Sequence, residues 1–394
     1  MRVLMVSEPG RYGVLVYVRN LIGFLREVHP EITVDYAYSS VRGSPDNEAL
    51  VAAVRERGGE TFDMRVSNAP APADLAALQG ITGLVRRVRP DVIHAHSSKA
   101  GALARGLRFL GMAPPVLYSP HGYYGMSLRG GLKEKMFNGI EGLLGRREWT
   151  HNISIHERTF ARDVLRLPVE RTLLIFSGVD LDRFSSVSPE RRAELRRSLG
   201  LPAEARLLVT LGRDVFEKNY ADLYAALRRV LPELPNVHFA HAGNGAVELK
   251  AGLGESLQSR ATAFPFLDDP EHLLQAADGF VLPSRTEAFG LAAFEALGCG
   301  LPVILTSTMG FLTLKELGFS GIRWVPNPAE CGSVAAELGE AIRDWAGARN
   351  EPPPDRAGLE RWFRSSHQFE KVTGVYRALA ATGSLKVSEW QDLG

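Results

Sequence analysis

Residues 283–303, PSRTEAFGLAAFEALGCGLPV, carry two glutamates, Glu287 and Glu295, eight positions apart. The apolar run 279–282 before this stretch is typical of a buried strand, and the glycines and proline of 298–302 indicate the end of a helix. The sequence therefore predicts a strand, a loop, a helix and a stop, with one glutamate in the loop and the other on the helix.

The spacing of the two glutamates distinguishes two kinds of site. If the helix begins near Phe289, its rise of about 1.5 Å per residue separates the carboxylates by roughly 12 Å. A hydrolytic carboxylate pair needs its oxygens about 5 to 9.5 Å apart across one glycosidic bond. The spacing therefore favours one elongated ligand held at both ends over a hydrolytic pair.

Outside this stretch, short apolar runs alternate with helical patterns, which is typical of parallel strands joined by crossover helices. Strands are expected at residues 2–6, 32–38, 91–96, 116–119, 172–176, 206–211, 237–240, 261–266, 280–282, 303–305 and 322–325. Further helices are expected at residues 14–25, 44–57, 74–88, 100–110, 132–144, 189–199, 220–230, 359–365 and 368–381, before a short polar tail. A chain of 394 residues is too long for one ordinary core, so we expect an α/β protein of two domains.

The composition excludes several classes of protein. Hydrophobic residues make up 45% and charged residues 23% of the chain, and the net charge of +1 gives no overall field that would attract nucleic acid. The two cysteines, Cys299 and Cys331, fit a reducing compartment and exclude a disulfide framework. Because residues 1–10 lack a signal-peptide pattern and no apolar run approaches about 20 residues, we expect a cytoplasmic protein.

Glycines and cations follow several of the expected strands. Gly13 lies in the loop after the first strand, where backbone can approach a ligand, although there is no GxGxxG pattern. Arg213 and Lys218 share one strand-to-helix loop, which suits a diphosphate or, alternatively, surface salt bridges. Gly243 and Gly245 form another glycine loop at a strand end.

Three histidines and a lysine lie at the ends of strands in the first half. His94 and His96 share a strand face, and satisfied strand-end histidines are favoured over a metal pair because no carboxylate or thiol is near in sequence. His121 comes just beyond a strand's carboxyl end, where open α/β sheets bind ligands. Lys99 beside a helix N-terminus could bind an anion, and a solvated lysine is the open alternative.

The expected helix 132–144 carries apolar residues at positions 132, 136, 140, 143 and 144, with Lys133, Lys135, Arg146 and Arg147 around this stripe. A basic amphipathic helix can lie on an anionic membrane. We favour packing of the stripe on the sheet, because every helix of an α/β protein has such a stripe. Peripheral membrane association remains the alternative.

Several of these stretches together resemble the family 4 glycosyltransferases, which are retaining enzymes of the GT-B fold. The resemblance rests on TLGRDVFEKN, HAGNG, FVLPSRTEAFGLAAFEALGCGLPVI and SGVD, within residues 172–305. In the first half, PDVIHAHSSKAGALAR and YSPHG are similar to members that build cell-surface polysaccharides. Departures occur at RYGV in the first loop and at STMGFLTLKELG after the last matching strand, so the resemblance assigns no contacts to residues 308–310.

The resemblance implies two Rossmann-like parallel-sheet domains that face each other across a ligand cleft. The first would span residues 1–178 and lie on the acceptor side, and the second would span residues 179–367 and bind the nucleotide sugar. A C-terminal helix at about 368–394 would pack back on the first domain.

The resemblance also implies roles for individual residues. Arg213 and Lys218 would hold the nucleotide diphosphate, Glu287 would contact hydroxyls of the donor sugar, and Glu295 would accept hydrogen bonds from the ribose. His121 would face the donor sugar from the first domain. The further donor-binding residues would be Gly13, Gly243, Gly245, Ala288, Phe289, Gly290 and Leu291, with Lys99 on the acceptor side.

Enzymes of this family need no cofactor and no metal ion, since fixed cations neutralise the diphosphate. Asp180 and Asp182, whose DxD pattern could otherwise hold a divalent ion, would then be linker residues. The expected partners are a nucleotide-sugar donor, with UDP favoured, and a lipid-linked or glycan acceptor.

Two other functions stay open beside transfer of a hexosyl or N-acetylhexosaminyl group. A GT-B epimerase would act on the nucleotide sugar alone. Lys218 of the EKN motif, together with Glu287 and Glu295, argues against this function. A catalytically silent nucleotide-sugar-binding subunit is disfavoured because the expected charged residues are all present.

Overall fold

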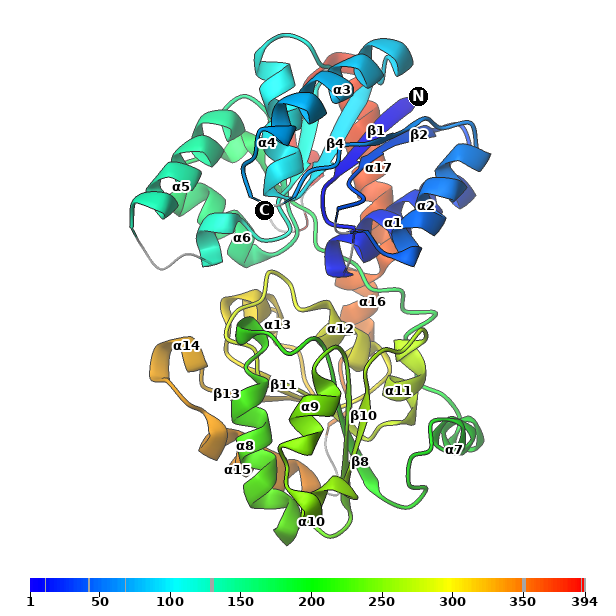
Figure 1. Ribbon diagram of the computed structural model, residues 1–394, viewed down its shortest axis with the longest axis vertical. Helices are drawn as coiled ribbons and strands as arrows, with labels where there is room; N and C mark the ends of the chain where they lie inside the picture. Colours follow the sequence, from blue (N-terminus) through cyan, green and yellow to red (C-terminus); the bar gives the residue numbers. More distant parts are fainter. Residues whose placement is uncertain are drawn as a thin grey trace. The chain divides into compact units, whose positions relative to one another are not determined.

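The computed structural model describes residues 1–10, 12–41, 43–67, 69–127, 131–348, 352–390 and 392. The chain forms two compact units (Figure 1). The N-terminal unit consists of Met1–Ser177 together with Ser366–Gly394, and the C-terminal unit consists of Gly178–Ser365.

The N-terminal unit contains a parallel sheet of seven strands in the order β3-β2-β1-β4-β5-β6-β7. The strands are β1 (Arg2–Ser7), β2 (Thr33–Tyr38), β3 (Thr61–Asp63), β4 (Val92–His96), β5 (Val116–Ser119), β6 (Trp149–Asn152) and β7 (Thr172–Leu174). The helices are α1 (Tyr12–Val28), α2 (Pro45–Glu56), α3 (Ala73–Val88), α4 (Ser98–Phe109), α5 (Leu132–Gly145), α6 (Ile155–Thr159) and α17 (Ser365–Thr382). Helices α1, α2 and α17 cover one face of the sheet, and α3 and α4 cover the other. Because both faces are buried, β1 reads as an unbroken apolar run rather than an alternating one.

Two strands, β3 and β6, are absent from the sequence prediction. β3 has only three residues. β6 has the sequence WTHN and reads as polar, yet all four residues are buried, and the side chains of His151 and Asn152 find hydrogen-bond partners in β7 and the residue after it. His151 Nε2 lies 2.9 Å from the carbonyl oxygen of Ile175, and Asn152 donates to the carbonyl oxygen of Leu173 at 2.9 Å.

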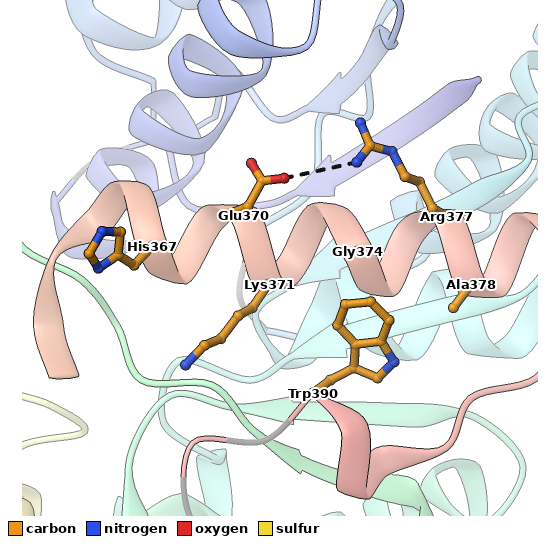
Figure 2. A pocket seen from close by; sticks show the side chains of 7 residues that line it. All are labelled: His367, Glu370, Lys371, Gly374, Arg377, Ala378 and Trp390. Carbon is orange, nitrogen blue, oxygen red and sulfur yellow. Dashed lines mark ion pairs between the residues drawn. The ribbon is translucent and has the colours of Figure 1, made fainter. Parts of the chain in front are cut away.

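The chain after α17 is tied to the N-terminal unit, so the expected short polar tail is wrong. Leu385 and Val387 are buried in the core beside α17. The ring of Trp390 packs on Gly374, where a Cβ atom would lie 2.0 Å from it. The hollow beside this contact is lined by His367, Glu370, Lys371, Gly374, Arg377, Ala378 and Trp390 (Figure 2). None of the expected site residues is in that lining, so we do not assign the site there.

Helix α5 exposes its apolar stripe, and the favoured packing of this stripe on the sheet is wrong. The exposed fractions are 85% for Leu132, 51% for Met136, 42% for Ile140 and 59% for Leu143. The residues that α5 buries instead are Glu141, Gly142 and Gly145.

The buried face of α5 is explained by one ion pair and by close approach at a glycine. Arg105, which is 1% exposed, donates to the Glu141 carboxylate at 2.7 Å, and Tyr118 donates to its other oxygen at 3.1 Å. A Cβ atom on Gly145 would lie 2.8 Å from the Leu167 side chain, so the glycine permits this contact. A buried arginine needs a charged partner, and this requirement orients the helix.

The C-terminal unit contains a parallel sheet of six strands in the order β10-β9-β8-β11-β12-β13. The strands are β8 (Arg206–Leu211), β9 (Val237–Ala242), β10 (Ala261–Phe264), β11 (Gly279–Leu282), β12 (Val303–Thr306) and β13 (Ile322–Val325). The helices are α7 (Pro189–Ser198), α8 (Tyr220–Val230), α9 (Ala246–Ala251), α10 (Glu255–Gln258), α11 (Pro270–Ala276), α12 (Leu291–Gly298), α13 (Leu312–Glu316), α14 (Pro328–Cys331), α15 (Ala335–Gly347) and α16 (Arg356–Phe363). Helices α8 and α15 bury one face around Trp345. Within the described residues, no helix is both long and apolar enough to cross a membrane.

Candidate functional site

Four loops of the C-terminal unit follow strands that are neighbours in the sheet. β9, β8, β11 and β12 are adjacent and parallel, so their carboxyl ends share one edge. Along the sheet, the chain continues from β8 to β9 in one direction and from β11 to β12 in the other. The boundary between β8 and β11 is therefore the topological switch point, where open α/β sheets bind ligands. Arg213, Lys218, Gly243 and Glu287 lie on these loops.

Lys218 and Glu287 form an ion pair between the loops after β8 and β11. The Lys218 Nζ atom lies 2.5 Å from Glu287 Oε1, and Ser284 donates to the same oxygen at 2.6 Å. The side chains of the pair are only 24% and 11% exposed, so solvent screens it little. The ion pair thereby joins Lys218, which is expected to hold the diphosphate, with Glu287, which is expected to contact the donor sugar. Arg213 lies partly exposed at the start of the same loop.

Arg285 holds the same two loops together. Its guanidinium donates to the side-chain oxygen of Asn219 at 2.6 Å and lies 4.8 Å from the ring centre of Phe216. Its backbone N–H donates to the carbonyl oxygen of Glu217 at 2.7 Å. Lys218 is therefore flanked on both sides by residues that Arg285 anchors.

The glycines of the loop after β9 are required by packing between loops. Gly243 has φ of 151°, and a Cβ atom there would lie 1.9 Å from the carbonyl oxygen of Gly212. Gly245 has φ of 91°, and its Cβ atom would lie 2.5 Å from the Cβ of Asp214. No larger residue fits at either position without movement, and a contact of this loop with the donor stays a prediction.

The backbone from Ala288 to Leu291 leads into α12, which begins two residues later than expected. Gly290 precedes the helix with φ of 83°, and no side chain caps the helix N-terminus. The Phe289 side chain is buried and stacks on Phe294 with ring centres 4.0 Å apart. The Phe289 side chain is therefore closed to a ligand, and uncapped N–H groups at a helix start favour an anion.

Glu295 lies on α12 beside an ion pair of Arg183 and Glu271, whose atoms are 2.7 Å apart. Desolvation raises the pKa of Glu295 to about 7, while Arg183 opposes this shift and Glu271 adds to it. In the described part of the chain no donor is hydrogen-bonded to its carboxyl group. Its acceptor capacity is thus unused, which is what a ribose hydroxyl would require.

In the N-terminal unit, His121 lies in the loop after β5 with a left-handed backbone φ of 52°. Its Nε2 atom is 3.0 Å from Nδ1 of His96, and its ring meets Tyr17 edge-on at 4.8 Å. Desolvation, followed by the nearby His151, lowers the pKa of His121 to about 3, so the ring is neutral at pH 7. The carboxylate of Glu157 accepts from the Gly122 N–H and fixes the peptide that follows His121.

Lys99 is neither solvated nor free of partners. Its ammonium group donates to Asp74 at 2.6 Å and to the carbonyl oxygen of Ala69 at 2.7 Å, and the side chain is 9% exposed. The solvated alternative is therefore wrong, and an acceptor bound by Lys99 would have to share it with Asp74.

Gly13 lies in the first turn of α1 with no atom within 4 Å of a Cβ position, so packing does not require a glycine there.

The DxD pair of the connecting segment has protein partners. Asp180 accepts from the backbone N–H groups of Asp182 and Arg183 at 3.1 and 3.0 Å. Asp182 pairs with Arg364 at 2.7 Å. These contacts give both carboxylates a structural role in the connection.

Sequence reasoning missed the residues that hold the site residues in place. Ser284 and Arg285 read as loop residues, and Glu157 lies far from His121 in sequence. An available signal was the pattern S-x-x-E, which occurs in SIHE at residues 154–157 and in SRTE at residues 284–287. Ser154 accepts from the backbone N–H of Glu157, and the Glu157 side chain accepts from the N–H of Ile153, whereas Ser284 donates to the Glu287 side chain, so in both places the motif makes local hydrogen bonds.

Comparison with protein families finds two matching models. The model "Glycosyl transferase 4-like domain" matches residues 13–212, and "Glycosyl transferases group 1" matches residues 191–350. A curated relative from Escherichia coli, "UDP-Gal:alpha-D-GlcNAc-diphosphoundecaprenol alpha-1,3-galactosyltransferase", is 27% identical over 257 residues, which cover 63% of this chain and 66% of the relative. Two further curated relatives are matched over 47% and 48% of their length, so the chain spans about half to two thirds of these relatives.

Solved structures resemble the chain over nearly its whole length. Sucrose-phosphate synthase from Thermosynechococcus elongatus has a TM-score of 0.74 at 20% identity and covers 97% of this chain and 99% of its own. HepE from Anabaena, solved in complex with UDP-glucose, has a TM-score of 0.71 at 18% identity and covers 96% and 100%. At these identities the likeness concerns the fold alone.

Proposed function

The chain belongs to glycosyltransferase family 4 and has the GT-B fold, and from this premise we propose that it is an active, retaining glycosyltransferase. It moves a hexosyl or N-acetylhexosaminyl group from a UDP-sugar to a lipid-linked or polysaccharide acceptor. The observation that carries this proposal is the Lys218–Glu287 pair, which places a cation and a hydroxyl acceptor side by side at the topological switch point.

The proposed chemistry follows from where charge develops. Glycosyl transfer makes the sugar ring positive and the departing diphosphate negative, so fixed cations stabilise the transition state more than the ground state. Lys218, Arg213 and the uncapped N-terminus of α12 supply positive charge on the same sheet edge. Because these groups neutralise the leaving diphosphate, we propose that no metal ion is required.

Glu287 acts in this scheme as a positioning group for the sugar. Its carboxylate already accepts from Lys218 and Ser284, so it is suited to sugar hydroxyls rather than to covalent attack on the ring. Retention then requires attack by the acceptor on the face that the diphosphate leaves. Glu295 binds the ribose, and His121 contacts the donor sugar.

The donor and acceptor classes are supported by similar proteins. HepE was solved with UDP-glucose, and the name of the E. coli relative gives UDP-Gal as donor and a sugar on diphosphoundecaprenol as acceptor. A lipid-linked acceptor requires access to a membrane surface. The exposed stripe of α5, with Lys133, Lys135, Arg146 and Arg147 also exposed, fits an anionic bilayer, and we assign it that role.

The donor is identified by thermal unfolding of the full chain with UDP-, ADP- and GDP-sugars. A ligand at 100 times its dissociation constant adds about 2.7 kcal/mol to the free energy of unfolding. We expect the largest rise in melting temperature with UDP-sugars. Stabilisation by another nucleotide alone would contradict the UDP assignment.

Catalysis is tested with the stabilising donor and membrane-derived acceptors. We expect Glu287→Ala and Lys218→Ala each to lower turnover by at least about 100-fold, as loss of a transition-state contact worth about 3 to 4 kcal/mol does elsewhere. The control is Glu233→Ala, which removes a surface ion pair with Arg343 in the same unit. Unchanged turnover in Glu287→Ala would refute the site, and conversion of the donor without acceptor would indicate an epimerase instead.

A further inference from the structure

Four histidines surround the ends of neighbouring strands in the N-terminal unit. His94 and His96 are on β4, His151 is on β6, and His121 follows β5. His94, His96 and His151 are fully buried, and the rings of His94 and His96 lie 4.0 Å apart. Desolvation lowers the pKa of all four, so each is neutral at pH 7 and carries its proton on one ring nitrogen only.

The tautomers of His94 and His151 are fixed by a chain of hydrogen bonds that ends on a backbone carbonyl. His151 Nε2 must donate to the Ile175 carbonyl oxygen, so its Nδ1 accepts from Ser119 at 2.8 Å. Ser119 in turn accepts from His94 Nε2 at 2.7 Å. His94 Nδ1 is left to accept the hydroxyl of Tyr376, which ties α17 to the sheet. This chain uses both nitrogens of each of the two rings and does not include His121.

His96 and His121 share a separate hydrogen bond, between His96 Nδ1 and His121 Nε2 at 3.0 Å. Only one of these nitrogens carries the proton. The other ring nitrogen of His96, Nε2, is buried and has no partner among the described residues. If His121 donated, the His96 proton would lie on Nε2 as a buried N–H without an acceptor. If His96 donates, Nε2 holds only an unused lone pair.

The second arrangement is favoured because buried N–H groups without a partner are rarer and more costly than unused lone pairs. His121 then accepts at Nε2 and carries its own proton on Nδ1. No hydrogen bond to that Nδ1 atom occurs within the described residues, and it is not among their buried unsatisfied atoms. His121 therefore has an accessible N–H group whose direction is set by a buried neighbour.

We propose that His96 is a positioning residue that holds neutral His121 in the Nδ1–H tautomer, so that His121 offers the donor sugar a fixed N–H group. This role rests on the proposed function, in which His121 contacts the sugar. Two contacts then define His121: Glu157 holds the peptide that follows it, and His96 holds its ring. An uncharged N–H donor can bind a sugar oxygen without placing a second positive charge beside the developing cation of the ring.

The tautomer is tested first without any substrate, by ¹⁵N NMR of histidine-labelled full-length protein at pH 7. The ring nitrogens of His121 are assigned by their absence in His121→Asn. We expect the proton of His121 on Nδ1 in the wild type. A His121 ring protonated on Nε2, or on both nitrogens, would overturn the proposal.

The matched variants are His96→Asn and His96→Gln, which carry the same amide group at different distances from the backbone. The amide nitrogen of asparagine can replace Nδ1 and donate to His121, whereas that of glutamine corresponds to Nε2. We expect His96→Gln to change the His121 tautomer and to lower kcat at least tenfold, with the dissociation constant of UDP within about twofold of wild type. His96→Asn is expected to keep the tautomer and to restore turnover to within about threefold.

The outcomes separate this proposal from the function on which it rests. Equal turnover of His96→Gln and wild type, or equal losses in both variants with intact melting temperatures, would refute a positioning role for His96. A wild type that transfers no sugar from any stabilising donor would instead contradict the proposed function, and the NMR experiment would still decide the tautomer.

Discussion

Arg285 holds the loop that carries Lys218 against the loop that carries Glu287 by contacts within the protein. It bonds Asn219 next to Lys218, stacks on Phe216, and lies two residues before Glu287. A lysine cannot reproduce this arrangement, because it lacks the planar group that both donates and stacks. The geometry of the cation and the carboxylate therefore depends on a residue that need not touch substrate.

We expect Arg285→Lys to weaken UDP binding about tenfold, which equals about 1.4 kcal/mol and lies at the lower end for a hydrogen bond to a charged group. Titration calorimetry with UDP measures the change. Arg343→Ala serves as control, because Arg343 pairs with Glu233 at the surface, where such pairs contribute about 0 to 1 kcal/mol. Equal dissociation constants for Arg285→Lys and wild type would show that the two loops are held by other contacts.

At this scale the sequence identifies the charged residues but not their partners. Glu287 and Lys218 are recognisable from their motifs, yet their ion pair spans 69 positions and no local pattern reveals it. Lys99 shows the same limit, because Asp74 lies 25 positions away. Pairing depends on which loops the sheet order brings together, and spacing along the chain does not contain that information.

The strands of the C-terminal unit follow the sequence closely because their apolar runs are bounded by clear signals, whereas helices α9, α10, α11, α13, α14 and α15 are absent from the sequence prediction. β8, α8 and β13 begin and end where the sequence predicts. α5 differs in orientation, since periodicity gives an apolar stripe but not the surface that it meets. Glu141 and Gly145, and not the apolar stripe, determine which face of α5 is buried, because the buried Arg105 needs an anion and the glycine allows close contact.

The exposed stripe of α5 predicts salt-sensitive binding to anionic vesicles. Replacing Leu132, Met136, Ile140 and Leu143 together by serine removes the apolar part of this surface. We expect vesicle binding to fall at least tenfold, because burying each such side chain contributes about 1.5 to 3 kcal/mol at most. The melting temperature is expected to change little, since all four side chains are exposed.

Co-sedimentation with vesicles of mixed phosphatidylcholine and phosphatidylglycerol at low and high salt provides the measurement. The matched control replaces Leu75 and Val169, which are 69% and 58% exposed elsewhere on the same unit, by serine. Wild type that fails to bind at low ionic strength would count against a membrane role for α5, as would unaltered binding of the fourfold variant.

For the whole molecule, buried histidines make stability depend on pH. Desolvation lowers the pKa of histidines in both units: His94, His96, His121, His151, His156, His238 and His241. An unfolded histidine has a pKa near 6.5, so between about pH 6.5 and 4 the unfolded chain binds protons that the folded chain does not. Their stabilising contribution is complete above pH 6.5 and is lost as the pH falls through the lowered values.

Glu157 and Glu295 act in the opposite sense, because burial raises the pKa of each to about 7. Between about pH 4.5 and 7 the folded chain holds protons that the unfolded chain releases, so these two groups lose stabilising effect as the pH rises. The histidines outnumber them, and the net expectation is a free energy of unfolding that falls on acidification from pH 6.5 to 4.5. Each unopposed group contributes about 1.4 kcal/mol per pH unit.

Unfolding transitions measured calorimetrically from pH 7 to 4.5 test this balance. His238→Gln removes one such group from the C-terminal unit, where His238 Nε2 is 2.9 Å from Thr262 Oγ1 and glutamine can keep that bond. This variant is expected to reduce the slope of stability against pH by about 1.4 kcal/mol per unit, with the transition of the N-terminal unit unaffected. A melting temperature that is constant or rises on acidification would contradict the expected excess of the histidine contribution over that of Glu157 and Glu295.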